Sequence, residues 1–582
     1  MAQSTRPAEC DVIIRGASVL DGTGAPARSA DVAITDGRIV EVGRITSTAR
    51  QEIHVGGALL TPGFVDIHTH YDGQVTWDTS LMPSSGHGVT TVVMSNCGVG
   101  FAPVRPGDHD RLVELMEGVE DIPGAALHEG LAWNWETFPD FLDVLSRAER
   151  DIDFAAQVPH GPLRLYVMGE RGANREPATA GEIAEMGRLV AEAVVAGALG
   201  FTTSRTVNHR TSRGEPTPSL NAARAELVGV AKAMGATGRG VLQVVSDFFD
   251  LDDEMATIRA MLAASGRPLS VSLAQDPRRP ELYRSVLAEL DAINDAGHTM
   301  RAQVAARGIG VLIGLQGTVN PLTRCPSFRD LRALPPAEQA RAISDPTLRA
   351  VLATEFSTGS AQRMVNLANT YVLGTPPDYE PDPANTIAAR ATRLGREPAD
   401  LLIELLAADD GKALLYAPVL NYAGGNLDAV GEMMSHANCV PGLSDGGAHV
   451  GTICDASYPT TMLAHWGIHR ARGPRFELPW LVRQQTRATA ETVGLLDRGV
   501  IAQGYKADIN IIDPDTLGLD SPQIAYDLPA NGKRLLQPAT GYLHTFVSGV
   551  ETQRGGRPTG RFPGRLVRGA RPDPTDRNRM RP

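Results

Sequence analysis

The chain has 582 residues, which is enough for one large barrel with a smaller domain or for several domains. It carries 55 basic and 67 acidic residues, a formal net charge of −12, which argues against general binding to nucleic acid or to an anionic membrane surface. Five cysteines without CxxC spacing do not indicate a disulfide framework, and no apolar run approaches the length of a membrane span. We therefore expect a cytoplasmic protein with a small-molecule substrate and no nucleic-acid or membrane partner.

Short strands are predicted at both ends of the chain. In residues 10–60, apolar and polar positions alternate around two Asp-Gly pairs, which suit tight turns between antiparallel strands. A similar pattern returns in YKADINIIDPDT and YLHTFVSGVETQRGG. Because chain ends often lie close together, we expect residues 1–60 and 497–565 to form one small β-sandwich domain. The Arg/Pro-rich residues 566–582 are predicted to be a disordered tail.

The stretch TPGFVDIHTH, residues 61–70, places two histidines two residues apart behind a short apolar run that is predicted to be a buried strand. Alternate side chains of a strand share one face, so His68 and His70 should project from the same side and converge on one metal ion. Neutral imidazole is a common zinc ligand, and a metal held there would indicate a hydrolase. Taken alone, an HxH pair is more often two unrelated polar residues.

Residues 61–496 are predicted to form a (β/α)₈ TIM barrel, because eight short apolar runs recur and several are followed by segments with helical spacing. Runs that are nearly all apolar suit a parallel sheet covered on both faces. The helix-rich interval 317–412 is too long for a simple crossover and could cover the barrel mouth as a lid. The eight runs are FVDIHTH, VTTVVMSNC, FAAQVPHG, ALGFTTS, VLQVVSD, LSVSLAQ, GVLIGLQG and CVPGLSDGG.

Two further candidate ligands end other predicted strands. Cys97 ends the second run, and a thiolate beside two histidines would be a strong zinc ligand. Asp445 ends the last run, which lies beside the first when the barrel closes; it could bind metal, take a proton from the attacking water, or do both. Each residue alone is more often structural. Barrel enzymes place their chemistry at the carboxyl ends of the strands, so the joint pattern indicates a shared metal site.

Four other polar residues follow strand-like runs and could contact substrate. His160, His209 and His449 could orient substrate or stabilise an oxyanion, although each could equally be a surface or structural histidine. Arg205 could pair with a substrate carboxylate, although most arginines are solvated or structural.

The sequence resembles the amidohydrolase superfamily, and within it the N-acyl-D-amino-acid deacylase (D-aminoacylase) branch. The resemblance covers both terminal regions and much of the barrel, and the SNCG cysteine is typical of this branch. It implies that His68 and His70 are metal ligands of the first strand, Cys97 a metal ligand and Asp445 the catalytic aspartate. The matching segments are DVIIRGASVLDGTG, DGRIVEVG, LLTPGFVDIHTHYD, GVTTVVMSNCGVGFAP, GALGFTTS, LSDGG, TVGLLDRGVIAQGYKADINIIDP and VSGVETQRGGRPTGR.

The sequence departs from this family where the deacylases carry metal-binding histidines after strands five and six. Here those runs read VLQVVSDF and PLSVSLAQ, with Gln243 and Leu273 or nearby residues at the expected positions. A carboxylated lysine on strand four, found in many relatives, is also missing, because no lysine falls on a strand-like run. We expect one zinc ion per chain and leave a second metal open. A catalytic metal needs an open position for water, so either one of the four candidates is not a ligand or the coordination expands.

Three functions remain open on the sequence. The first is a metal-dependent hydrolase that cleaves a C–N amide bond in an N-acyl (D-)amino acid or a related small molecule. The second is a hydrolase of a different amide, cyclic amide or ester with a remodelled mononuclear site, which the replaced histidines favour. The third is a metal-depleted, non-enzymatic binding or assembly protein, against which the retention of all four candidate ligands argues. A homo-oligomer is possible.

Overall fold

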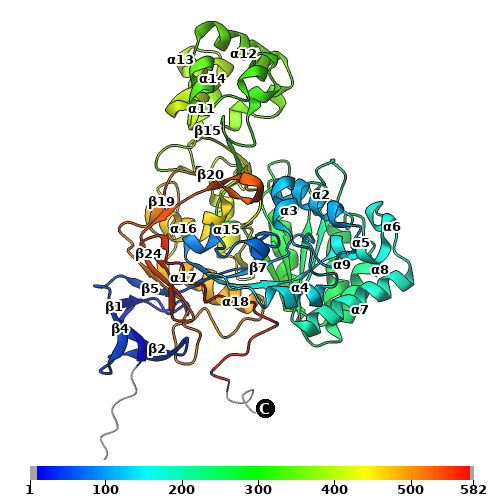
Figure 1. The fold of residues 1–582 in the computed structure, drawn as a ribbon, viewed down its shortest axis with the longest axis vertical. Coiled ribbons are helices and arrows are strands. Elements are labelled where there is room, and N and C mark those ends of the chain that lie inside the picture. The colour runs from blue at the N-terminus through cyan, green and yellow to red at the C-terminus, as the bar shows by residue number, and fades with distance from the viewer. Residues whose placement is uncertain (1–9, 577–582) are drawn as a thin grey trace, which may run out of the picture.

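The computed structural model describes residues 10–576, and its centre is a barrel of parallel strands (Figure 1). One part of the barrel has the order β6-β7-β8, and the other continues from β9 to β17. The barrel closes where Thr69 bridges Gly446 in parallel and the His70 N–H donates to the Gly446 carbonyl at 2.8 Å. The strands are β6 (Phe64–Asp66), β7 (Val89–Met94), β8 (Asp153–Ala156) with its continuation β9 (Val158–Pro159), β10 (Gly200–Arg205), β11 (Val241–Ser246), β12 (Leu269–Leu273), β13 (Met300–Val304) and β17 (Cys439–Pro441).

The seventh barrel strand differs from the sequence prediction. That prediction placed it in GVLIGLQG, which was wrong: the run forms β14 (Ile309–Ile313), which pairs antiparallel with β16 (Leu415–Leu420) outside the barrel. The seventh position is taken by β13, which lies between β12 and β17. Its sequence MRAQV contains Arg301 and Gln303, so it lacks the nearly continuous apolar run that is typical of a buried parallel strand.

Helices that follow barrel strands in the chain pack around the outside of the barrel (Figure 1). α7 (Ala180–Ala196) begins at a capping box in which Thr179 and Glu182 each bond the backbone N–H of the other, and it ends at Gly197 with φ 122°. Its buried residues include Met186 and Val190, which belong to the main apolar core. The helices that follow it are α8 (Arg224–Gly235), α9 (Leu251–Ser265) and α10 (Leu282–Asp295).

Strands from both ends of the chain join in one nine-stranded sheet. The link between the two ends is β5 beside β18, with Thr61 opposite Asn510. The sheet has its own apolar core, which includes Ile14, Val32 and Ile509. The β-sandwich form of this region stays a prediction. The strands run in the order β25 (Arg557–Pro558), β24 (Val550–Arg554), β23 (Tyr542–Val547), β18 (Ile509–Ile512), β5 (Leu59–Pro62), β1 (Cys10–Val19), β2 (Arg28–Thr35) and β3 (Arg38–Gly43), and β4 (Ala49–His54) also pairs with β1.

The insertion between β14 and β16 contains a small helical bundle, which projects from the rest of the molecule at the top of Figure 1. It has a separate apolar core, with Leu352, Phe356, Leu402 and Leu406 among its buried members. A role as a lid stays a prediction. The bundle consists of α11 (Pro336–Ile343), α12 (Pro346–Thr358), α13 (Ile387–Leu394) and α14 (Pro398–Gly411).

The end of the chain is ordered further than predicted. Disorder from residue 566 onward was wrong for 566–576, because the Val567 N–H donates to the Phe154 carbonyl at 2.8 Å and its side chain is buried. The Arg571 N–H likewise donates to the Gly494 carbonyl at 2.8 Å. Residues 577–582 lie outside the described part of the chain. Among the described helices, none combines the length and apolar character needed to cross a membrane.

Candidate metal centre

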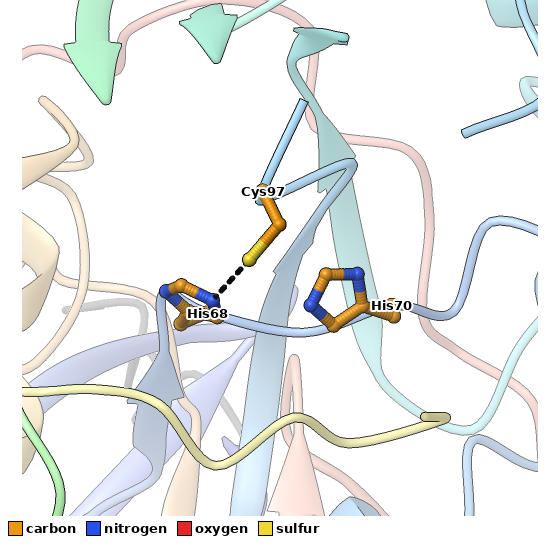
Figure 2. A group of neighbouring side chains, drawn as sticks. All are labelled: His68, His70 and Cys97. Carbon is orange, nitrogen blue, oxygen red and sulfur yellow. Dashed lines mark hydrogen bonds between the residues drawn. The ribbon is translucent and has the colours of Figure 1, made fainter. Parts of the chain in front are cut away.

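Three candidate ligands meet at the end of the barrel where β6 and β7 terminate (Figure 2). One ligand atom from each of His68, His70 and Cys97 lies within 4.8 Å of the other two, and all three residues are buried. His68 Nε2 is 3.3 Å from Cys97 Sγ. The His68 backbone N–H donates to Asp66 at 3.2 Å, which fixes the chain as it leaves β6.

Asp445 brings a carboxylate to the same place from the loop after β17. Its Oδ1 lies 3.4 Å from His68 Nε2 and 3.7 Å from His70 Nε2, and its backbone N–H donates to the His68 carbonyl at 3.1 Å. Tetrahedral zinc with bonds of about 2.0–2.3 Å separates neighbouring ligand atoms by about 3.3–3.8 Å. The distances of 3.3 Å from His68 Nε2 to Cys97 Sγ and 3.4 and 3.7 Å from Asp445 Oδ1 to the two Nε2 atoms lie in this range, so His68, His70 and Cys97 could hold one zinc ion with Asp445 beside them.

The two imidazoles have the chemical state that a metal requires. Burial lowers the pKa of His70 to about 4 and also lowers the pKa of His68, so both rings are neutral at pH 7. Neither nitrogen of His70 has a hydrogen-bond partner, although both are buried. A buried polar atom without a partner costs about 1–3 kcal/mol, which a metal bond to Nε2 would relieve.

Cys97 and Asp445 place acidic groups beside these rings. Burial raises the pKa of the Cys97 thiol, and the carboxylates of Glu120 and Asp445 raise it further. Burial also acts to raise the pKa of Asp445, but His70 and His68 outweigh it and hold that pKa well below its usual range. A coordinated metal deprotonates a thiol outright, so a cation is what would make Cys97 a ligand here.

Gln303 of β13 orients His68. Its Oε1 lies 2.7 Å from His68 Nδ1, and its Nε2 donates to Ser270 Oγ at 2.9 Å. Because an amide oxygen only accepts, His68 carries its proton on Nδ1 and turns Nε2 toward Cys97 and Asp445. Gln243 Nε2 approaches the same Nδ1 at 3.3 Å, but the shorter contact to Gln303 determines the tautomer.

Gln243 and Leu273 stand where the family's two further histidines are expected, and each has another role in the protein. Gln243 Oε1 accepts the Cys97 N–H at 3.3 Å, so this side chain supports the loop that carries the cysteine. Leu273 is buried and apolar and belongs to the main core. Neither residue offers a nitrogen or sulfur ligand of the kind that zinc prefers.

Glu120 is a functional candidate that sequence reasoning missed. It is the last residue of α2 (His109–Glu120), it is 1% exposed, and its Oε1 lies 3.2 Å from His70 Nδ1. Burial raises its pKa, and the carboxylates of Asp445 and Asp72 add to the shift. A signal was present: Glu120 follows Leu112 and Met116 at intervals of four, so it lies on the apolar face of the helix.

Two of the predicted substrate residues lie near the candidate ligands. His449 Nε2 is 3.5 Å from Glu120 Oε2, and the imidazole remains about one-third exposed, at 31%. His209 Nδ1 is 2.9 Å from Ser204 Oγ. Burial lowers the pKa of His209 to about 3, and the neighbouring rings of His449 and His70 add to the shift. Both residues are therefore placed where they could meet a substrate.

His160 lies elsewhere and does not fit a substrate role. It is fully buried, with Nδ1 2.8 Å from Thr203 Oγ1 and Nε2 2.8 Å from Glu226 Oε1. Arg164 also pairs with Glu226. Because both ring nitrogens are engaged, the expected substrate contact of His160 is corrected to a structural one.

Arg205 is likewise engaged by the protein. Its Nε and Nη2 donate to the Glu254 carboxylate at 2.7–2.9 Å, and its Nη1 donates to the Ala222 carbonyl at 2.7 Å. All three guanidinium nitrogens are therefore occupied, and the expected pairing of Arg205 with a substrate carboxylate is not supported. Its side chain joins the end of β10 to α9 instead.

The chain is similar to known proteins in sequence and in fold. The model of the Amidohydrolase family matches residues 51–557. A D-aminoacylase of Alcaligenes xylosoxydans xylosoxydans is 26% identical over 571 residues, covering 96% of this chain and 97% of that protein. Two solved structures are similar in fold. One is a D-aminoacylase, described as having a binuclear metal centre with one-metal activation and second-metal attenuation (TM-score 0.65, 24% identity, 97% of this chain and 100% of that one). The other is an N-acyl-D-glutamate deacylase of Bordetella bronchiseptica complexed with zinc and a phosphonate inhibitor (TM-score 0.62, 24% identity, 96% and 100%).

Proposed function

The chain belongs to the amidohydrolase family, and on this premise we propose that it hydrolyses the C–N amide bond of an N-acyl (D-)amino acid or a related small molecule with the help of one zinc ion. The observation that carries the proposal is that His68, His70 and Cys97 bring ligand atoms within 4.8 Å of one another, with Asp445 Oδ1 3.4 Å and 3.7 Å from the two Nε2 atoms. The long similarity to a D-aminoacylase supports the reaction class.

A single ion is proposed because the second ligand set is incomplete. Gln243 and Leu273 stand where the deacylases are expected to carry histidines, and both are used by the protein in other ways. The description of a similar D-aminoacylase as activated by one metal supports a mononuclear mechanism. When bound, zinc would act as a Lewis acid on the substrate carbonyl and would lower the pKa of water toward about 7.

Asp445, His449, His209 and Gln303 would each have a separate role in the reaction. Asp445 has a lowered pKa and is ionised at neutral pH, so it can accept a proton from the attacking water and return it to the leaving nitrogen. His449 is partly exposed and His209 lies near the same cluster, so either could donate a hydrogen bond to the carbonyl oxygen as negative charge develops. Gln303 would hold His68 in the tautomer that binds metal.

One observation favours a second candidate, the hydrolysis of a different amide, a cyclic amide or an ester. A free amino-acid carboxylate is usually held by an arginine, and the arginine expected for this purpose is occupied by Glu254. A substrate without that carboxylate would not need Arg205. The two candidates share the same metal chemistry and differ in the group that is recognised.

The first experiment is elemental analysis of protein purified without chelator or nickel affinity, for wild type and Cys97→Ala. About one zinc per chain, weakened or lost in the variant, supports the proposed centre. The zinc-loaded enzyme is then offered N-acyl-D- and N-acyl-L-amino acids, neutral amides, cyclic amides and esters. Absence of metal from the wild type would overturn the mechanism, and turnover of only the neutral compounds would select the second candidate.

A further inference from the structure

His70 lies between two carboxylates. On one side its Nε2 is 3.7 Å from Asp445 Oδ1, and on the other its Nδ1 is 3.2 Å from Glu120 Oε1. His68 has a similar arrangement, since its Nε2 faces Asp445 while its Nδ1 contacts the amide oxygen of Gln303. Each imidazole thus has a side-chain oxygen beside its Nδ1, which is hydrogen-bonded in His68 and 3.2 Å away without a hydrogen bond in His70.

Glu120 has no evident structural purpose. Within residues 10–576, the ion-pair neighbours of its carboxylate are His70 and His449, and no arginine or lysine pairs with it. Its Oε1 is buried without a hydrogen-bond partner. Burying a carboxylate is costly unless it is paired, and a site that holds a dication offers the compensation that the rest of the protein does not.

The main chain fixes Glu120 at this place. Its carbonyl oxygen accepts the backbone N–H of His449, so the end of α2 is fastened to the loop that also carries Asp445. Residues on the same face of the helix, such as Leu112 and Met116, are buried in the core and hold the helix against the barrel. The carboxylate is therefore brought to His70 by a rigid element rather than by a free loop.

We propose that Glu120 is a positioning residue of the metal centre: its Oε1 lies 3.2 Å from His70 Nδ1 without a hydrogen bond in this structure, and it accepts the Nδ1–H once Nε2 binds metal beside Asp445. Its second carboxylate oxygen orients His449 at the edge of the site. The arrangement is a carboxylate–histidine–metal series, which fixes the imidazole tautomer and raises its basicity. In this chain it supplies negative charge to a centre that lacks the histidines after strands five and six. The inference rests on the proposed metal centre but not on the identity of the substrate.

The test compares the zinc dissociation constants of full-length wild type, Glu120→Gln and Glu120→Leu, measured by competition with a chromophoric chelator. Glu120→Leu removes both the acceptor and the charge and should weaken zinc binding by about 10–100-fold. Glu120→Gln keeps an acceptor, as Gln303 does for His68, but loses the charge, so its affinity should fall several-fold and lie between the other two. Glu114→Gln is the matched control, because Glu114 lies on the same helix and pairs with the exposed Arg213.

A second readout separates positioning from general damage. Cobalt(II) is substituted for zinc, and the visible absorption reports the geometry and the thiolate of the loaded site. We expect Glu120→Gln to alter this spectrum while its far-UV circular dichroism matches wild type. Unchanged zinc affinity and cobalt spectrum in Glu120→Gln would overturn the inference, even if Glu120→Leu fails to fold. Zinc binding that depends on Glu120 in a chain that hydrolyses no amide would refute the proposed function and leave this role of Glu120 intact.

Discussion

Gln303 Oε1 and His68 Nδ1 lie 2.7 Å apart, although the two residues are 235 positions apart in the sequence. Gln303 belongs to the seventh barrel strand and His68 follows the first, so this contact crosses the interior of the barrel. The amide is held in one orientation because its Nε2 donates to Ser270 Oγ. Its oxygen therefore points at His68. β13 contributes no metal ligand, yet it determines which nitrogen of the His68 ring faces the metal.

Replacement of Gln303 by leucine should weaken zinc binding by about 10–100-fold. The leucine removes the acceptor for Nδ1, so His68 would no longer be held with Nε2 toward Cys97 and Asp445. Chelator competition measures the change. Gln339→Leu is the control, because Gln339 is a buried amide of the helical insertion that donates to the Leu334 carbonyl. If Gln303→Leu binds zinc as tightly as wild type, the assigned tautomer of His68 is wrong.

Asp445→Asn should separate catalysis from metal binding. The asparagine cannot accept a proton from the attacking water, so kcat should fall by about 10²–10⁴-fold on any amide that wild type hydrolyses. Zinc should remain close to one per chain, since His68, His70 and Cys97 are unchanged. Elemental analysis and steady-state kinetics are measured on the same sample, with Asp513→Asn in a surface turn as the control. Loss of zinc together with activity would show that Asp445 acts mainly as a ligand.

Glu226→Leu should damage stability rather than chemistry. The substitution leaves Arg164 and His160 buried without their acceptor, and breaking such a pair costs about 3–5 kcal/mol. The thermal unfolding midpoint of the zinc-loaded protein should therefore fall, while kcat per folded, zinc-loaded chain should stay near that of wild type. Glu185→Gln, in an exposed pair with Arg188, should cost no more than about 1 kcal/mol. A selective loss of kcat with normal stability would return His160 to the substrate site.

Local sequence pattern was informative where a site residue ends an apolar strand. His68, Cys97 and Asp445 each follow such a run, so their meeting at one end of the barrel could be predicted from periodicity and the rule for parallel barrels. β13 was missed because two of its five residues are Arg301 and Gln303, which break the apolar run. For the same reason, Gln303 was not among the predicted site residues.

The roles of the other candidate residues could not be predicted, because their partners lie far away in the sequence. His160 and Arg205 do follow strand-like runs, but the sequence could not show that Glu226 and Glu254 engage their polar atoms. These partners lie 66 and 49 residues away along the chain. Glu120 approaches from a helix, where a rule based on strand ends does not apply. Only the packing of complete elements decides whether such a polar side chain meets substrate, metal or another residue.

The acid sensitivity of the fold should depend on Glu380. Burial acts to raise the pKa of this carboxyl, but hydrogen bonds from His465 and Arg470 outweigh it and lower the pKa to about 2. A glutamate in an unfolded chain has a pKa of about 4.3, so Glu380 stabilises the fold fully above that pH and loses its contribution as pH falls toward about 2. The stability difference between wild type and Glu380→Gln should therefore be largest at pH 5 and should shrink between about pH 4 and pH 2.

Urea unfolding midpoints are measured across this range on metal-free samples of both proteins, so that loss of zinc in acid does not contribute. Glu192→Gln, in an exposed pair with Arg188, should show only a small difference from wild type at every pH. A wild-type advantage that stays constant or grows toward pH 2 would show that the Glu380 carboxylate is not what stabilises this contact.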